Sequence, residues 1–242
     1  VVQRAVAAGV GRIMICGLHE GDWDQVLAMA ETHEALVPAL GIHPWFIENR
    51  SPRWADILAQ KLETSGAAVG EIGLDRMIRP RNDDDQEQVL IRHLEIARGL
   101  KLPVNLHCRS AWGRMIEILK SMGGLPYGGV VHSWSGSAEM VREFEKLGCF
   151  ISFSGSVTRP DNKKVQKAVQ AVSRDRLVLE TDSPDILPTG IEANLNEPAF
   201  VRSVLESVGF LRGETVEDVA GYTFENAQRL FSTCRWNERK TP

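Results

Sequence analysis

The chain has 242 residues, of which 43% are hydrophobic, and this is long enough for one α/β barrel domain of about 250 residues. Its formal net charge of -4 argues against a pervasive basic surface, and therefore against a histone-like or repressor-like protein. No apolar run approaches the roughly 18 residues that are needed to span a bilayer, so we expect no membrane partner.

The four cysteines lack the C-x-x-C spacing of zinc ribbons, and three of them lie in apolar, strand-like runs. This usage indicates thiols in a reducing compartment rather than a disulfide scaffold. We therefore expect a cytoplasmic protein, although the same usage fits the nucleus or an organelle. We also expect a monomer.

Helix-like and strand-like segments alternate along the whole chain. The expected helices are 1–10, 22–33, 54–62, 85–100, 112–122, 138–147, 162–172, 199–208 and 216–231. The expected strands are the short apolar runs 13–16, 36–40, 67–75, 104–107, 129–132, 149–153 and 177–181. Such alternation is typical of βαβ units with a parallel sheet. No linker or repeat interrupts it, so we expect a single domain over residues 1–242.

The count of elements suggests a particular α/β fold. Each of the seven strands is followed by a helix, and one further helix stands in front without a strand. A closed (β/α)8 barrel has eight strands, whereas an open cylinder of seven would leave two unpaired edges. We therefore predict a TIM-type barrel whose first strand is lacking from the chain as given.

Four of the expected strands lead directly to a histidine or a carboxylate. These strand ends carry Glu71, His107, His132 and Asp182. Each of these residues alone fits a structural role, but the carboxyl ends of parallel strands meet on one rim of a barrel. Imidazole and carboxylate together suit zinc, manganese or magnesium. The pattern therefore predicts a divalent-metal site.

Further residues near these strand ends could contact a substrate. His43 ends another strand, where it fits either a substrate contact or a hydrogen bond within a turn. Arg109 could hold a phosphate by paired hydrogen bonds, or form a surface ion pair. Trp45 and Trp134 could stack on a base, although buried aromatic residues are the commoner case.

In these residues the chain resembles the TatD family of metal-dependent deoxyribonucleases, which belongs to the amidohydrolase-like barrel superfamily. The stretches that carry the resemblance are 41–44, 69–75, 102–109, 131–136, 179–184 and 196–198, followed by the helix that contains Asn226. The resemblance implies two divalent ions (magnesium, manganese or zinc) and hydrolysis of phosphodiester bonds in DNA. We expect cleavage from a strand end, because no extended basic groove is visible.

The resemblance also implies roles for individual residues. Glu71 would bridge the two ions, His107 and His132 would bind one ion, and Asp182 would bind the other. Glu71 and Asp182 would be the catalytic residues, with Asp182 as a base. The residues assigned to the substrate and its phosphate are His43, Arg109 and Asp75.

Two other interpretations stay open. Members of the family carry a His-x-His pair on the first strand, and no such pair occurs in this chain. The chain would then be a shortened form with impaired catalysis, which keeps the barrel surface as a binding module. Alternatively, the barrel would hydrolyse an amide or a lactone, although no lysine ends a strand where a carbamylated ligand would be expected.

Overall fold

The computed structural model describes residues 1–234 and 236, which form two compact units. Unit 1 comprises Val1–Gly11 and Val131–Arg229, whereas unit 2 comprises Arg12–Val130 and the C-terminal segment from Leu230. A single domain over the whole chain stays a prediction.

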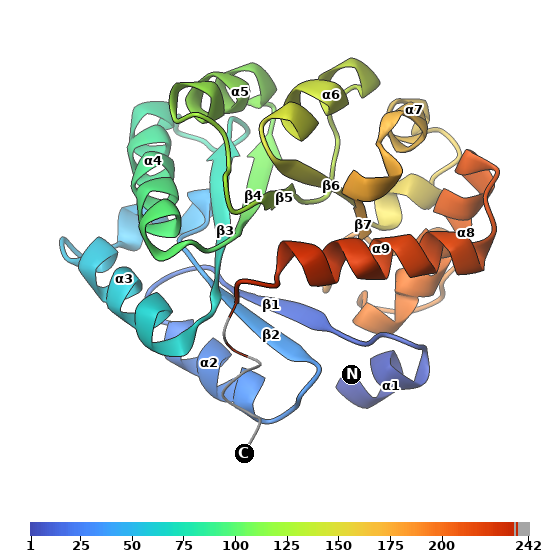
Figure 1. The fold of residues 1–242 in the computed structure, drawn as a ribbon, viewed down its shortest axis with the longest axis horizontal. Coiled ribbons are helices and arrows are strands. Elements are labelled where there is room, and N and C mark those ends of the chain that lie inside the picture. The colour runs from blue at the N-terminus through green and yellow to red at the C-terminus, as the bar shows by residue number, and fades with distance from the viewer. Residues whose placement is uncertain (235, 237–242) are drawn as a thin grey trace. The chain divides into compact units, whose positions relative to one another are not determined.

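Unit 2 alternates strands and helices (Figure 1). Its elements are β1 (Ile13–Gly17), α2 (Trp23–Glu31), β2 (Leu36–Leu40), η1 (Pro44–Asn49), α3 (Trp54–Ser65), β3 (Ala68–Asp75), α4 (Asp83–Leu100), β4 (Val104–Arg109), α5 (Trp112–Ser121) and most of β5 (Gly129–Val131). The strands β1 to β4 pair in parallel and in sequence order. Parallel order requires each helix to cross back over the sheet, so every strand of the unit ends at the same edge.

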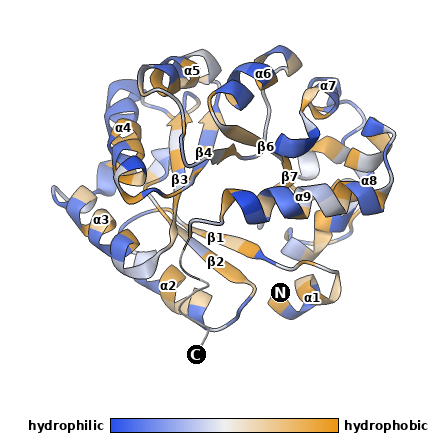
Figure 2. Cartoon of the chain, in the orientation of Figure 1, coloured by the Kyte–Doolittle hydropathy of each residue, from blue (hydrophilic) through white to orange (hydrophobic). Residues whose placement is uncertain are grey.

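The strands β2 and β3 are almost completely buried because they are mostly apolar, whereas β1 is half-buried over most of its length. All five residues of β2 are buried, and seven of the eight residues of β3 are buried as well. Figure 2 shows hydrophobic residues along β1 and β2, whereas α4 carries both hydrophilic and hydrophobic residues. A continuous apolar strand is typical of a parallel sheet that is covered on both faces.

The pairing of β3 with β4 contains a bulge at the position of Glu71. Val69 pairs with Val104 and Ile72 pairs with Leu106, so two residues of β3 stand opposite one residue of β4. Bulges often lie beside functional sites, where they redirect a side chain. Beyond the bulge the register is regular, and it sets Gly73 opposite His107.

Unit 1 contains the remaining elements. These are α1 (Val2–Ala7), α6 (Ala138–Lys146), β6 (Cys149–Phe153), η2 (Gly155–Thr158), α7 (Lys163–Ala171), η3 (Arg174–Arg176), β7 (Leu177–Leu179), η4 (Pro198–Phe200), α8 (Val201–Arg212) and α9 (Val216–Leu230) up to Arg229. The strands β6 and β7 are parallel, with Ile151 opposite Leu177. The side chain of Asn226 on α9 donates hydrogen bonds to the carbonyl oxygens of Arg174 and Leu177, which fixes the start of β7.

The elements agree with the predicted α/β pattern, with differences at their ends. The helix α8 extends to Arg212, four residues beyond the predicted end, and stops at Gly213 in a left-handed conformation. The helix α4 begins at Asp83 rather than Asp85, and η1 was not predicted. The four cysteines are free thiols, as expected. In the described part of the chain no helix has the length and apolar character to cross a membrane.

Candidate metal centre

His43 is held at the end of β2 by hydrogen bonds to the backbone around it. The indole nitrogen of Trp23 donates to the Gly41 carbonyl at 2.8 Å, and the Ile42 backbone nitrogen donates to His93 Nε2 at 3.1 Å. His43 itself is extended and caps η1, because its Nδ1 accepts from the backbone nitrogen of Trp45 at 3.2 Å. Pro44 follows as the first residue of η1, where its missing N–H is not needed.

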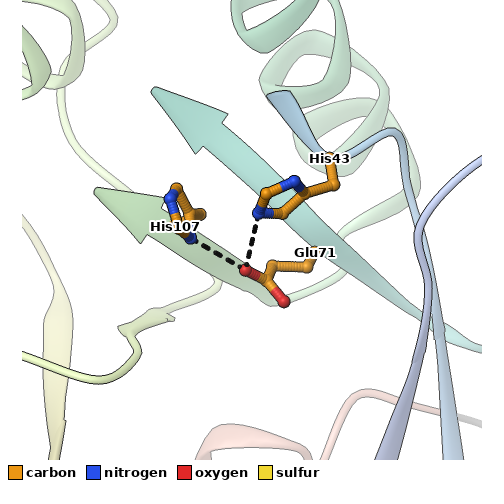
Figure 3. Close-up of side chains that lie close together, drawn as sticks. All are labelled: His43, Glu71 and His107. Atoms are coloured by element: carbon orange, nitrogen blue, oxygen red, sulfur yellow. Dashed lines mark hydrogen bonds and ion pairs between the residues drawn. The ribbon is translucent and has the colours of Figure 1, made fainter. Parts of the chain in front are cut away.

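Glu71, His43 and His107 converge at one carboxylate oxygen (Figure 3). Oε1 of Glu71 lies 3.2 Å from Nε2 of His43 and 3.0 Å from Nδ1 of His107. One ligand atom from each of the three residues lies within 4.8 Å of the others, which is close enough to surround one ion. Two imidazoles and a carboxylate are a donor set that suits zinc or another divalent transition metal. Glu71 and His107 therefore fit a divalent cation, whereas the part of His43 depends on which of its ring nitrogens carries the proton.

His107 lies between two carboxylates. Its Nδ1 faces Glu71, whereas its Nε2 lies 3.3 Å from Oδ2 of Asp75. Gly73 on β3 pairs with His107 on β4. Glu71 lies two residues before Gly73, and Asp75 lies two residues after it. Because Gly73 has no side chain, the backbone of His107 can approach it closely; a Cβ on Gly73 would lie 1.9 Å from the His107 carbonyl oxygen. A carboxylate that receives one ring N–H leaves the other ring nitrogen free of its proton and able to bind a metal.

Asp75 does not fit the phosphate-binding role that was predicted for it. The side chain has no exposed surface, and its oxygens accept from Trp45 Nε1 at 2.8 Å and from the Met77 backbone nitrogen at 2.8 Å. Burial raises the pKa of Asp75, but the hydrogen bonds from His107, Trp45 and Met77 outweigh burial and hold it below its usual range. A buried, charged carboxylate would repel a phosphate, so we revise its role to orienting His107.

The hydrogen bonds of His43 indicate that its Nε2 is a hydrogen-bond donor. Its Nδ1 accepts a backbone N–H, so in the neutral ring the proton sits on Nε2, the nitrogen that faces Glu71. A protonated nitrogen has no lone pair for a metal, but it can donate to a carboxylate or phosphate oxygen. Of the two roles, phosphate contact therefore agrees better with the hydrogen bonds of His43.

Arg109 ends β4, two residues after His107, and its side chain is exposed. Its backbone carbonyl accepts from the Arg76 backbone nitrogen at 2.9 Å, which continues the pairing of β3 with β4 to the strand ends. The guanidinium is thus carried on a fixed backbone and faces water. A phosphate can reach the guanidinium at this position, so the contact of Arg109 with a phosphate stays a prediction.

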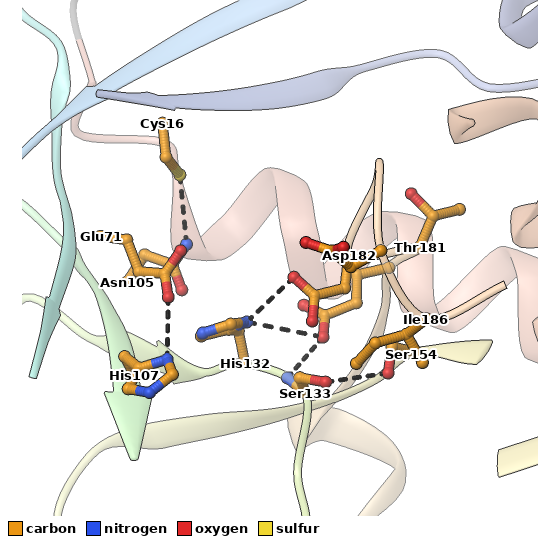
Figure 4. Close-up of polar contacts among 12 residues, drawn as sticks. Cys16, Glu71, Asn105, His107, His132, Ser133, Ser154, Thr181, Asp182 and Ile186 are labelled. Carbon is orange, nitrogen blue, oxygen red and sulfur yellow. Dashed lines mark hydrogen bonds and ion pairs between the residues drawn. The ribbon is translucent and has the colours of Figure 1, made fainter. Parts of the chain in front are cut away.

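Unit 1 brings His132 and Asp182 together, as Figure 4 shows. Nδ1 of His132 lies 3.8 Å from Oδ1 of Asp182 and 3.9 Å from Oε1 of Glu180. Glu180 was not among the residues predicted for the site; its Oε1 also accepts from the backbone nitrogen of Ser133. The pKa of Glu180 is raised to about 7, chiefly by burial; the nearby His132 opposes this shift, and the negative charge of Asp182 adds to it. The available signal was the Glu-x-Asp spacing, which puts two carboxylates within three residues of the end of β7.

The loop after β7 holds Asp182 in an unusual conformation. Asp182 has φ +60° and Ile186 has φ +49°, in the left-handed region that side chains other than glycine rarely adopt. Asn196, which is buried, donates to the carbonyl oxygens of Thr181 at 2.7 Å, Asp185 at 2.6 Å and Ile186 at 3.1 Å. Such conformations persist where neighbouring contacts fix them, often at functional sites.

The predicted site residues thus fall into two groups, one in each unit. Unit 2 brings together Glu71, His107, His43 and Asp75, and unit 1 brings together His132 and Asp182. The two tryptophans differ, because Trp134 is fully buried and Trp45 is 57% exposed. Trp134 therefore packs in the core of unit 1, which agrees with the expectation that such aromatic residues are more often buried than available to a base. The metal-binding and catalytic roles of these residues stay predictions.

Comparison with known proteins identifies similar chains. The family described as TatD related DNase matches residues 1–232. YabD of Bacillus subtilis, an uncharacterized metal-dependent hydrolase, is 34% identical over 96% of this chain and 91% of its own length. The 3'-5' ssDNA/RNA exonuclease TatD of Klebsiella pneumoniae is 33% identical over 96% of this chain and 90% of its own length.

A solved structure gives the same result for the fold. The crystal structure of YjjV, a TatD homologue from Escherichia coli, matches with a TM-score of 0.91 and 35% identity. The match covers 95% of this chain and 90% of that chain. It confirms the fold class predicted from the sequence, an α/β barrel of the TIM type, with seven strands in the described residues.

Proposed function

The chain belongs to the family of TatD related DNases, and from this premise we propose that it hydrolyses phosphodiester bonds of single-stranded DNA from a strand end. Its similarity to metal-dependent hydrolases over nearly its whole length makes it an enzyme of that kind. The observation that carries the proposal is the convergence of His43 and His107 on one oxygen of Glu71. The name of the Klebsiella pneumoniae relative, a 3'-5' exonuclease of single strands, supports the choice of substrate.

The residues of unit 2 fit a divalent ion by the chemistry of their donor atoms. Glu71 would offer a carboxylate oxygen, and His107 would offer Nδ1 while its Nε2–H donates to Asp75. Divalent ions at such a site neutralise charge on the phosphate and lower the pKa of water. We propose two ions, magnesium, manganese or zinc, because the family resemblance implies a pair.

The remaining residues would act on the substrate. The Nε2–H of His43 would donate to a phosphate oxygen, and the exposed guanidinium of Arg109 would hold the same group by paired hydrogen bonds. Asp182 would accept the proton of the attacking water at Oδ1. We also propose that His132 binds metal in the same reaction, and that the protein acts as a monomer in the cytoplasm.

The test is the metal content and the nuclease activity of the purified chain. Elemental analysis would give the number of ions per chain, and a single strand labelled at either end would be incubated with magnesium, manganese or zinc. We expect a ladder that shortens from one end. The variants Glu71→Gln, His107→Ala and His132→Ala should lose most activity and keep the melting temperature. Glu31→Gln, at an exposed glutamate on α2, is the matched control and should match the wild type.

Other outcomes would support other functions. Internal fragments without end shortening would replace the exonuclease by an endonuclease. Hydrolysis of lactones or cyclic amides, without cleavage of DNA, would favour the second enzyme interpretation. A folded chain that binds no metal and cleaves nothing would contradict the proposal and favour a binding module.

A further inference from the structure

Trp45 is a large apolar side chain that stays exposed beside the candidate metal centre. Its exposed fraction is 57%, although tryptophan usually buries most of its surface in a folded chain. Its ring stands edge to face against the imidazole of His43, with centroids 5.0 Å apart and planes at 88°. His43 in turn faces Glu71. The indole therefore lies next to the position proposed for the phosphate.

Hydrogen bonds fix the orientation of this exposed ring. The indole nitrogen of Trp45 donates to Oδ2 of Asp75 at 2.8 Å, and this oxygen also lies 3.3 Å from Nε2 of His107. The backbone nitrogen of Trp45 donates to Nδ1 of His43. Both N–H groups of Trp45 are thus bound to residues of the centre. A ring that is held in place before binding loses little freedom when a ligand covers it.

Two of the exposed apolar residues of unit 2 donate hydrogen bonds to the same carboxylate, that of Asp75. Among the described residues of this unit, the large hydrophobic side chains that are exposed belong to Met29, Trp45 and Met77. Met77 is 49% exposed, and its backbone nitrogen donates to Oδ1 of Asp75 at 2.8 Å. Two of these three residues are therefore anchored on Asp75. A scattered surface residue needs no explanation, whereas such a grouping beside a site favours a ligand with an apolar face.

We propose that Trp45 is a stacking platform for the nucleobase of the nucleotide whose phosphate His43 contacts. This inference rests on the proposed function and adds a base-binding subsite to it. Every base has a flat π-face, so stacking on an indole tolerates any sequence. Inside a duplex each base is covered on both faces by its neighbours, whereas an unpaired base can turn a free face to the ring. Trp45 would thus favour single strands without reading their sequence.

The experiment separates the ring of Trp45 from its hydrogen bond. Trp45→Phe keeps an aromatic face and loses the N–H bond to Asp75, whereas Trp45→Leu loses both. Binding would be measured by fluorescence anisotropy with metal ions present, on a labelled, phosphorothioate-linked single strand that resists cleavage. We expect about 10-fold weaker binding for Trp45→Leu and much less loss for Trp45→Phe. Met29→Ala, at an exposed apolar residue on α2, is the control and should bind like the wild type.

A second strand, abasic at each end, completes the test. The wild type should bind it about 10-fold more weakly than the intact strand, and Trp45→Leu should bind both strands equally. Equal losses for Trp45→Phe and Trp45→Leu would overturn the platform, because the hydrogen bond to Asp75 would then explain the effect. If Trp45→Leu binds the strand like the wild type and DNA is still cleaved, the stacking role of Trp45 is wrong, while the proposed nuclease function stands. A wild type that neither binds nor cleaves strands would overturn the proposed function as well.

Discussion

Nε2 of His107 lies 3.3 Å from Oδ2 of Asp75, a carboxylate that is completely buried at the end of β3. Gln86 on α4 holds the backbone of Asp75 in place, because its side chain accepts from the Asp75 backbone nitrogen and donates to the Asp75 carbonyl oxygen. The carboxylate therefore cannot turn toward solvent, and it determines which nitrogen of His107 faces Glu71. A residue assigned to the substrate by sequence thus acts on a histidine of the centre.

Asp75→Asn should weaken metal binding without unfolding the chain. The amide keeps the shape of the carboxylate but lacks its charge, so it holds the Nε2–H of His107 less firmly. Loss of such a partner typically lowers metal affinity by about 10- to 100-fold. Isothermal titration calorimetry of the metal-free chain with zinc would measure the metal affinities of the variant and of the wild type. Asp84→Asn, at an exposed acid on α4, is the control, and equal affinities for the two variants would contradict the orienting role.

Gly73→Ala should prevent normal folding of unit 2. A Cβ at this position would lie 1.9 Å from the carbonyl oxygen of His107, which is backbone and cannot move aside. We expect a loss of more than about 4 kcal/mol in the free energy of unfolding, as for the most disruptive substitutions. Urea unfolding would measure it.

Gly99→Ala is the matched control for Gly73→Ala. Gly99 lies within α4, and a Cβ there meets no atom within 4 Å. Alanine is a better helix former than glycine, so the variant should gain about 0.5–1 kcal/mol. If both alanine variants lost stability, the close approach of β3 to β4 would not be the cause.

Asn196→Ala should loosen the loop that carries Asp182. The substitution removes the donor of three hydrogen bonds to the carbonyl oxygens of Thr181, Asp185 and Ile186. Leaving buried acceptors without a donor costs about 1–3 kcal/mol. We expect that loss in urea unfolding, together with a fall in nuclease activity. Asn194→Ala, at an exposed residue of the same segment, should change neither.

The buried His93 should make the chain less stable in mild acid. Burial lowers the pKa of His93 from 6.5 to about 4, although its bond to the Val89 carbonyl opposes the shift. Between these two values the unfolded chain binds the proton and the folded chain does not. Stability should therefore fall as the pH drops from about 6.5 toward 4, by on the order of 3 kcal/mol in total.

Unfolding of the wild type and of His93→Gln at several pH values would measure this contribution. Glutamine can accept from the Ile42 backbone nitrogen and does not titrate, so the variant should show a flatter pH dependence. Equal slopes for the two chains would show that other groups cause the loss in acid.

The strand ends of the candidate centre were predictable because the signal is local. An apolar run that stops at a His, Asp or Glu is visible within a few residues, as at His107 and Asp182. Glu180 was missed because it stands between the last apolar residue and a more obvious acid. The buried position of Asp75 was also missed, since a carboxylate at a strand end is usually expected to face solvent or a ligand.

By itself the sequence determined the order of strands and helices, their α/β class and the residue types at the strand ends. These follow from short apolar runs and from periodicity, which act over a few residues at a time. The tertiary structure decided the bulge at Glu71, the placement of His107 opposite Gly73 and the exposure of Trp45. Each of these depends on pairing or contact between segments about 30 residues or more apart, such as Glu71 with His107, 36 positions later. Local pattern cannot fix such a register, because only the packing of whole strands against one another selects it.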